Sequence, residues 1–105
     1  MIEIIYYRKN HRVQLQGHAG AGVPGQDIVC AAASMLAHTL AANARSLVER
    51  GDALGASIRL QRGDGEVACR AKRGKTVTAV FDTVCAGFAL LAQMEPEHVR
   101  YEVRV

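Results

Sequence analysis

Apolar residues recur at two different spacings along this chain, and the spacings divide it into short and long segments. In the short segments, apolar and polar residues alternate or β-branched residues cluster, which is typical of strands with one buried face. In the two long segments, apolar residues return every three or four positions, which is typical of helices. The pattern predicts strand, strand, helix, strand, strand, helix and strand, over residues 2–8, 12–18, 28–50, 56–62, 66–72, 76–93 and 98–104.

Short polar or glycine-rich turns join neighbouring strands in two places. Residues 9–11 separate the first two strands and residues 63–65 separate the next two, so each pair is expected to form a hairpin. In the second strand, Val13 and Leu15 face one way. His18 falls on the opposite face, whose other members are polar, and this favours an accessible ring.

Both predicted helices carry one apolar stripe and have recognisable ends. Asp27 is a preferred N-cap residue for the first helix, and Gly51 is suited to end it. Thr76 is expected to cap the second helix, and Pro96 stops any continuation beyond it. The stripes consist of Val29, Ala33, Leu36, Leu40, Ala44 and Leu47 in the first helix and Val77, Val80, Phe81, Val84, Phe88 and Leu91 in the second.

The order ββαββαβ predicts a two-layer α+β fold. Strands that bury one face need a single covering layer, so we expect two helices packed on one face of a mixed or largely antiparallel sheet. The chain has 105 residues, of which 50% are hydrophobic. This is enough for a core, and it predicts one domain spanning residues 1–105.

Composition argues against several classes of protein. No apolar run approaches the length of a membrane span, and the charged N-terminus does not resemble a secretory signal, so we expect a cytoplasmic protein. The 3 cysteines are an odd number, which argues against a disulfide framework and suits a reducing compartment. The net charge of +3 permits contact with RNA or an acidic partner without requiring it.

The densest group of chemically active residue types lies between Gly17 and Ser34, which reads GHAGAGVPGQDIVCAAAS. Cys30 falls in the first turn of the predicted long helix, where backbone N–H groups and the positive helix end favour a thiolate. His18 lies across a glycine-rich loop and is suited to take the thiol proton. These are the parts of an activated cysteine nucleophile, and they predict a small cysteine hydrolase, in particular a peptidase.

Each of these residues also has a purely structural interpretation. A free cysteine is most often a small buried residue, although Cys30 falls beside the apolar stripe and not on it. His18 taken alone is a surface histidine. Asp27 either caps the helix, the role that we place first, or orients the His18 imidazole. Ser34 shares a helix face with Cys30, and it either hydrogen-bonds the sulfur or a substrate carbonyl or is a small packing residue.

The remaining candidates are assigned to the core or to solvent. Cys69 and Cys85 lie on inward faces and are expected in the core. The basic turns 8–12 and 72–75 are most simply solvated, and direct nucleic-acid binding is not expected, because no aromatic residues interleave with the cations. No cofactor is expected, and no close His/Cys spacing suggests zinc. The histidines without a partner in the pattern, to which we give no role, are His11, His38 and His98.

The segment from Gly17 to Ser34 resembles the ribosomal-processing cysteine protease family. It shares with that family a Gly-His-Ala start, a glycine-rich loop, the run Gly-x-Asp-Ile-Val-Cys-Ala and a serine four residues after the cysteine. The predicted order of elements and the chain length agree with the family over nearly all of the chain. The loop departs from the family in one respect, since Ala21, Val23 and Pro24 make it more apolar and stiffer.

The resemblance implies a cytoplasmic bacterial endopeptidase without a cofactor. Its substrate would be the precursor of large-subunit ribosomal protein twenty-seven. The enzyme would remove a short N-terminal extension from this precursor, and this removal would be needed for ribosome maturation. The resemblance also implies a homodimer, no membrane partner, and a loop over residues 19–26 that moves to admit the peptide. It implies His18 and Cys30 as catalytic residues, Asp27 and Ser34 as supporting or orienting residues, and Gly17, Ala19, Gly20, Gly22 and Gly25 as substrate-loop residues.

Two further hypotheses come from other classes. A non-catalytic ribosome- or RNA-associated module would use the two basic turns, with Cys30 inert, and its RNA binding would weaken steeply with added salt. A metal site through His18, Asp27 and Cys30 is the third hypothesis.

Overall fold

The computed structural model describes residues 1–23 and 25–105, and its order of elements is ββαββαβ, as the sequence predicts. Pro24, one of the residues noted in the glycine-rich loop, lies outside the described residues. The elements are β1 (Ile2–Tyr7), β2 (Arg12–Gly17), α1 (Ile28–Glu49), β3 (Ala53–Gln61), β4 (Asp64–Ala71), α2 (Gly74–Met94) and β5 (Val99–Arg104).

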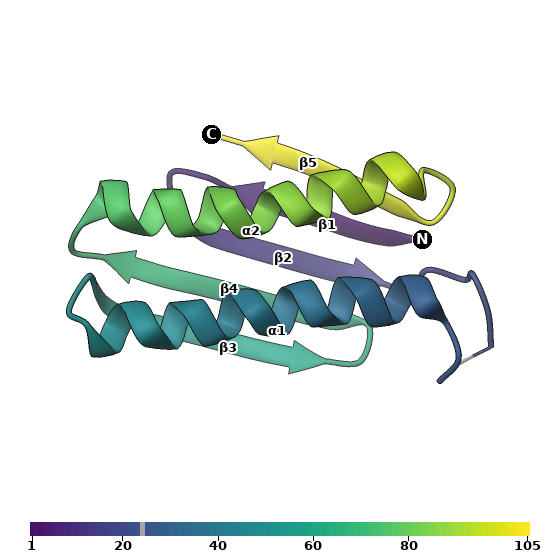
Figure 1. The fold of residues 1–105 in the computed structure, drawn as a ribbon, viewed down its shortest axis with the longest axis horizontal. Coiled ribbons are helices and arrows are strands. Elements are labelled where there is room, and N and C mark those ends of the chain that lie inside the picture. Colours follow the sequence, from purple (N-terminus) through teal and green to yellow (C-terminus); the bar gives the residue numbers. More distant parts are fainter. Residues whose placement is uncertain (24) are drawn as a thin grey trace.

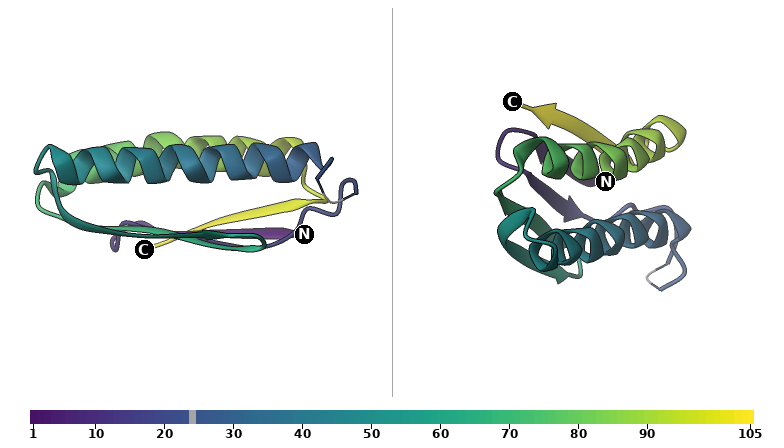
Figure 2. Two further views of the ribbon diagram at one scale, coloured as in Figure 1. Left: turned by 90° about the horizontal axis from the view of Figure 1, so that it is seen from below. Right: turned by 60° about the vertical axis from the view of Figure 1, so that its left-hand side comes forward.

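The strands form a mixed sheet in the order β3-β4-β2-β1-β5. β1 runs parallel to β5, and the other neighbouring pairs, including both predicted hairpins, are antiparallel. The two helices lie side by side on one face of this sheet (Figures 1 and 2). The predicted two-layer α+β fold is therefore confirmed.

The core fills the space between the sheet and the two helices. Tyr6 of β1 stacks on Phe81 of α2, with 6.1 Å between the ring centroids, and both are almost completely buried. Large side chains of this kind contribute roughly 1.5–3 kcal/mol each when they are fully buried. The two helices approach closely at Gly87 of α2, where an added Cβ would lie 2.6 Å from Cδ2 of Leu36. The buried alanines of α1 match this close approach, and they are Ala33, Ala37, Ala41 and Ala44.

Three predicted boundaries are wrong by two or more residues. β4 begins at Asp64, two residues before the predicted start, so Asp64 and Gly65 lie in the strand and not in the turn. β3 begins at Ala53, three residues before the predicted start. α2 begins at Gly74 with Arg73 in the N-cap position, so Thr76 lies inside the helix and does not cap it. The reason lies outside the helix, because the N–H groups of Lys72 and Arg73 both donate to the Asp52 carbonyl, at 3.0 and 2.9 Å. This pair of bonds fixes the chain just before Gly74, and the helix starts there.

The predicted absence of a membrane-length apolar run also needs correction. Among the residues described, α2 is long and apolar enough to cross a membrane by length and composition alone. Core helices of soluble proteins satisfy the same criterion. α2 packs on the sheet through Val77, Phe81, Cys85 and Phe88, which are buried.

Candidate active site

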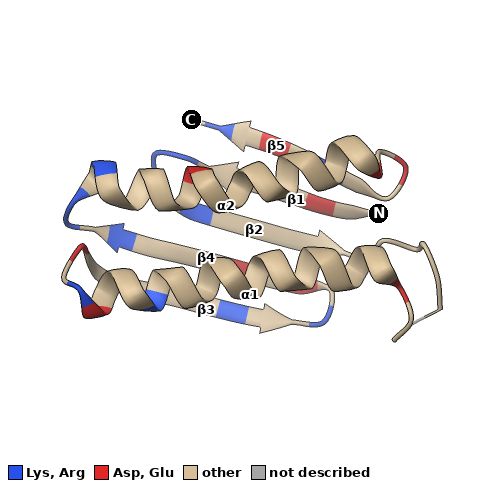
Figure 3. Cartoon of the chain, in the orientation of Figure 1, with Lys and Arg blue, Asp and Glu red and all other residues tan. Residues whose placement is uncertain are grey.

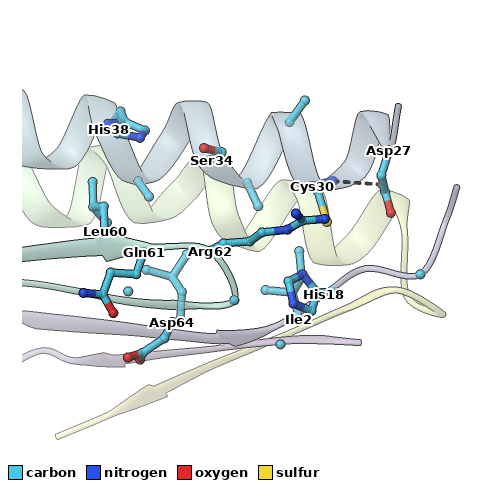
Figure 4. A pocket seen from close by; sticks show the side chains of 18 of the residues that line it. Ile2, His18, Asp27, Cys30, Ser34, His38, Leu60, Gln61, Arg62 and Asp64 are labelled. Atoms are coloured by element: carbon cyan, nitrogen blue, oxygen red, sulfur yellow. Dashed lines mark hydrogen bonds between the residues drawn. The ribbon is translucent and has the colours of Figure 1, made fainter. Parts of the chain in front are cut away.

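A cavity of about 860 Å³ lies between the first half of α1, the end of β2 and the turn that joins β3 to β4 (Figure 4). His18 and Cys30 both line it, from opposite sides of the glycine-rich loop. Figure 4 shows the imidazole between the sheet and α1, below the sulfur of Cys30. The structure thus brings the two residues singled out from the sequence to one cavity.

Gly17 turns His18 toward this cavity. The strand alternation that placed His18 with the polar residues of β2 ends at Gly17, whose φ of 96° is in the left-handed region. Its N–H donates to the Gly63 carbonyl at 2.9 Å, and an added Cβ would lie only 2.3 Å from the carbonyl oxygen of Met1. The prediction of an accessible His18 is confirmed, but its place on the open polar face is wrong.

The His18 ring rests against Gly63 in the turn between β3 and β4. A Cβ added to Gly63 would lie 2.7 Å from Nε2 of His18 and 3.0 Å from its Cε1. Gly63 also has a φ of 76°, which residues other than glycine rarely adopt. The missing side chain at position 63 therefore makes the space that the imidazole occupies.

Cys30 is the third residue of α1 and is half-buried. Its Sγ accepts a hydrogen bond from the backbone N–H of Ala19 at 3.3 Å. Ala19 is itself buried, with 3% of its surface exposed, so this donor is held in place by packing. This N–H therefore fixes the position of the sulfur at the start of α1.

Asp27 acts as the N-cap of α1. Its Oδ1 accepts from the N–H groups of Val29 and Cys30, both at 3.0 Å, and its Oδ2 accepts from Ala21 N–H at 2.9 Å. These bonds hold the pKa of the Asp27 carboxyl below its ordinary value, and the bond from Cys30 N–H has the largest effect. The carboxylate thus ties the glycine-rich loop to the helix start. In the part of the chain that the structure describes, it makes no hydrogen bond to His18.

Five more polar side chains line the cavity, and they are Ser34, His38, Gln61, Arg62 and Asp64. Ser34 and His38 follow Cys30 at successive turns of α1, and Arg62 comes from the β3–β4 turn. Figure 4 shows Arg62 extending along the cavity toward the Cys30 end, while Ser34 and His38 lie progressively farther from the sulfur. Ser34 is exposed, and no hydrogen bond joins it to Cys30 within the described residues.

The glycines of the predicted substrate loop lie where they can contact a bound peptide. Gly20, Gly22 and Gly25 line the cavity together with Gly17, whereas Ala19 is packed beneath it. Gly20 and Gly25 have positive φ angles of 69° and 86°. Their conformation therefore depends on the absence of a side chain.

His98 was given no role from the sequence, yet it contacts this site. Its Nδ1 lies 2.9 Å from the carbonyl oxygen of Ala19, so Nδ1 must carry the proton and donate. His98 is fixed in turn, because its N–H donates to Glu95 and its carbonyl accepts from Ile2 N–H. Nothing near His98 in the sequence indicates this contact, because it joins segments that are 79 residues apart.

The other two cysteines differ from Cys30 in their surroundings. Cys69 and Cys85 are buried, as predicted, and burial raises the pKa of both thiols, that of Cys85 to about 12. They remain protonated and unreactive near neutral pH. Among residues 1–23 and 25–105, no group of three or more His, Cys, Asp or Glu side chains is placed to hold a metal ion.

A half-exposed thiol at a helix start, in a cavity shared with a histidine, is the arrangement of a cysteine peptidase. The family model for the cysteine protease Prp matches residues 1–100, and the chain belongs to this family of cysteine proteases.

Several solved structures share this fold. The structure of the ribosomal processing protease Prp from S. aureus with a covalently linked product peptide has a TM-score of 0.76 and 19% identity, over 98% of this chain and 97% of that one. The S. aureus enzyme with a substrate peptide gives 0.70 and 18%, with the same coverage. SMU.848 from Streptococcus mutans gives 0.67 and 28%, over 97% of this chain and 90% of that one. No curated protein matched the sequence.

Proposed function

We propose that this cysteine peptidase removes the N-terminal extension of large-subunit ribosomal protein twenty-seven, with His18 and Cys30 as its catalytic dyad. One observation supports this dyad. The Ala19 N–H donates to the Cys30 sulfur, and His18, the residue next to Ala19, lines the same cavity as Cys30. The ribosomal substrate is supported by the S. aureus enzyme of the same fold, which is named a ribosomal processing protease and was solved with bound peptides.

The proposed reaction is acyl transfer through a thioester. His18 takes the thiol proton, and the Cys30 thiolate attacks the scissile carbonyl to form a tetrahedral intermediate. The intermediate collapses to the acyl-enzyme as the C–N bond breaks, and His18 gives the proton to the leaving amine. Water then attacks the thioester with His18 as base, and the acid product leaves as Cys30 recovers its proton.

The oxyanion of this intermediate needs N–H donors, and the structure limits which ones are available. The N–H groups of Val29 and Cys30 at the helix start already donate to Asp27 Oδ1. The Ala19 N–H, in contrast, points at the sulfur and so lies next to the carbon that the sulfur attacks. We assign the oxyanion contact to Ala19.

The same proposal covers the remaining expectations for the family. The enzyme acts in the cytoplasm as a homodimer, and the described residues of the loop, 19–23 and 25–26, move to admit the peptide. Val23 in the loop and Ile28 at the start of α1 are 62% and 79% exposed. Large apolar side chains left in water are suited to contact apolar residues of a bound peptide.

A cleavage assay tests this function. The wild type and the Cys30→Ala and His18→Ala variants are incubated with the extended ribosomal protein, and the products are weighed by mass spectrometry. We expect one defined cut by the wild type and none by either variant. The Cys69→Ala variant, which removes a core thiol away from the cavity, should retain the cut. Circular dichroism of each variant shows that a lost cut is not lost folding.

Two results would contradict the proposal in different ways. If the Cys30→Ala variant still cuts the substrate, Cys30 is not the nucleophile. No cut by the wild type, with the substrate shown to be folded and extended, would reject this substrate.

A further inference from the structure

Two basic turns that lie far apart in the sequence meet at one end of the molecule. Residues 8–12 run from the β1–β2 turn into β2, residues 72–75 run from the β4–α2 turn into α2, and Figure 3 shows their lysines and arginines at the same end. We call these two turns the basic end. His11 of the first turn contacts the elements on either side of the second. Its carbonyl accepts from Cys69 N–H of β4 at 2.9 Å, and its ring lies 2.7 Å from the Thr78 hydroxyl of α2.

Some cations of the basic end are already paired. Arg8 makes a salt bridge to Asp82 at 2.9 Å, and Arg73 makes one to Asp52, also at 2.9 Å. The others make no salt bridge to any carboxylate in the residues that the structure describes; they are Lys9, Arg12, Lys72 and Lys75. Arg12 is half-buried and the three lysines are exposed. The positive charge of the two turns is thus only partly neutralised within the chain.

The start of α2 adds to this positive charge. The first turn of α2 carries no acidic residue, and no side chain caps it. A hollow of about 380 Å³ lies beside it and is lined by Arg8, Gly74, Lys75 and Thr78, together with Ala79 and Asp82. The N-terminal end of a helix carries partial positive charge, so it reinforces the neighbouring cations.

The basic end is separate from the peptide cavity. The molecule measures 41 Å along its longest axis. The end of β2, which precedes His18, and the start of α1, which holds Cys30, lie toward the opposite end of that axis from the two basic turns (Figures 1 and 3). Glu95 and Glu97 lie in the turn between α2 and β5, at the far end of α2 from residues 72–75. A partner bound at the basic end would leave the cavity open.

We propose that the basic end binds the phosphate backbone of RNA. This reverses the expectation from the sequence that nucleic acid is not bound directly. That expectation concerned bases stacked on aromatic side chains, which contacts to phosphates do not need. Neither turn presents a large exposed apolar side chain, which a protein-binding surface normally has at its centre. Exposed lysines that make no salt bridge in the described residues are instead suited to phosphates, since binding releases counterions. The choice of RNA over other polyanions rests on the proposed function, because a ribosomal protein is incorporated among RNA. The surface would hold the enzyme on RNA with its cleavage site facing away.

Fluorescence anisotropy with a short fluorescein-labelled RNA stem-loop tests this, using the Cys30→Ala protein. If the basic end contacts about four phosphates, affinity falls roughly 100-fold between ~50 and ~200 mM salt. The double variant Lys9→Glu/Lys75→Glu should bind about 10-fold more weakly or worse. The control Arg59→Glu/Arg100→Glu changes the net charge equally but alters β3 and β5, and it should change affinity by less than about 2-fold.

Three outcomes would overturn the inference: no binding at low salt, binding that is insensitive to salt, or equal weakening by both double variants. Poly-glutamate that displaces the RNA and binds as tightly would show that the surface accepts acidic polypeptides, and it would also overturn the choice of RNA. Both double variants are also assayed, with Cys30 intact, on a short free peptide that spans the cut. If the wild-type protein binds RNA but does not cleave the substrate, the proposed function is rejected and the RNA-binding inference is not.

Discussion

The backbone of Ala19 connects the reactive cysteine to a histidine near the end of the chain. Its N–H donates to Cys30 Sγ at 3.3 Å, while its carbonyl accepts from His98 Nδ1 at 2.9 Å. One peptide segment is therefore fixed from both sides, directly after His18. The position of the proposed dyad, His18 and Cys30, therefore depends on His98, although no hydrogen bond joins His98 to either residue in the described part of the chain.

We expect the His98→Ala variant to lower kcat roughly 10-fold or more, because a small displacement of a reacting group costs much of the rate. His98→Asn should recover most of the activity, since its Nδ2 donates from nearly the same place as the histidine Nδ1. KM should change little, because His98 does not line the cavity. Steady-state kinetics on the extended substrate measure both.

The rate of Cys30 alkylation separates positioning from general destabilisation. His98→Ala should slow alkylation at pH 7, while a fold that is merely less stable exposes thiols and speeds it. Equal kinetics for His98→Ala and His98→Asn would contradict the positioning role.

Iodoacetamide should label Cys30 alone in the native protein at neutral pH. Cys69 and Cys85 are buried and burial raises the pKa of both, whereas Cys30 is half-exposed at the start of α1. Peptide mapping by mass spectrometry measures the labelling of each thiol. Labelling in urea, which should reach all three, is the control. Rapid labelling of Cys85 without denaturant would contradict the structure.

Gly63→Ala should damage activity more than stability. The added Cβ would lie 2.7 Å from His18 Nε2, so the ring must move from the cavity wall. We expect kcat/KM to fall by roughly 10- to 100-fold. The positive φ adds a stability cost of about 1 kcal/mol. Gly74→Ala is the control, because an added Cβ there meets nothing within 4 Å. Unchanged kcat/KM for Gly63→Ala would show that the His18 position does not limit the reaction.

The stability of the fold should fall in acid. Hydrogen bonds from Cys30 N–H to Asp27, from Arg73 to Asp52 and from Arg8 to Asp82 hold the pKa of each carboxyl below its ordinary value of 3.8. A depressed pKa stabilises the folded state above the unfolded-state pKa, and this contribution is lost as the pH falls through the folded-state value. Tm should therefore be lower at pH 3 than at pH 6.

A variant that replaces one of these carboxylates by a neutral amide identifies one source of this pH dependence. Asp52→Asn should lower Tm at pH 6 and reduce the difference between the two pH values, since its ion pairs with Arg73 and Arg50 are gone at both. A variant with the same pH dependence as the wild type would assign the effect to other carboxylates.

The periodic pattern determined most of the fold, because each element is set by residues close together in the sequence. Alternation in residues 12–18 and the four-three spacing along α1 reflect which faces must leave water, and this is a local property. Asp27 was identified as the cap for the same reason, since its oxygens reach N–H groups only two and three residues ahead. The boundaries at Ala53 and Gly74 were missed because hydrogen bonds from Lys72 and Arg73 to the Asp52 carbonyl join two turns that are far apart in the sequence.

By itself, the sequence determined the order of elements, the nucleophile candidate and the family resemblance, since residue types at short spacing carry them. Only the tertiary structure decided that His18 leaves the polar strand face, that Gly63 makes room for its ring, and that His98 holds Ala19. It also decided that the two basic turns share one end. These relationships join segments far apart in the chain, and chain folding alone sets the distance between them, because no local spacing encodes it.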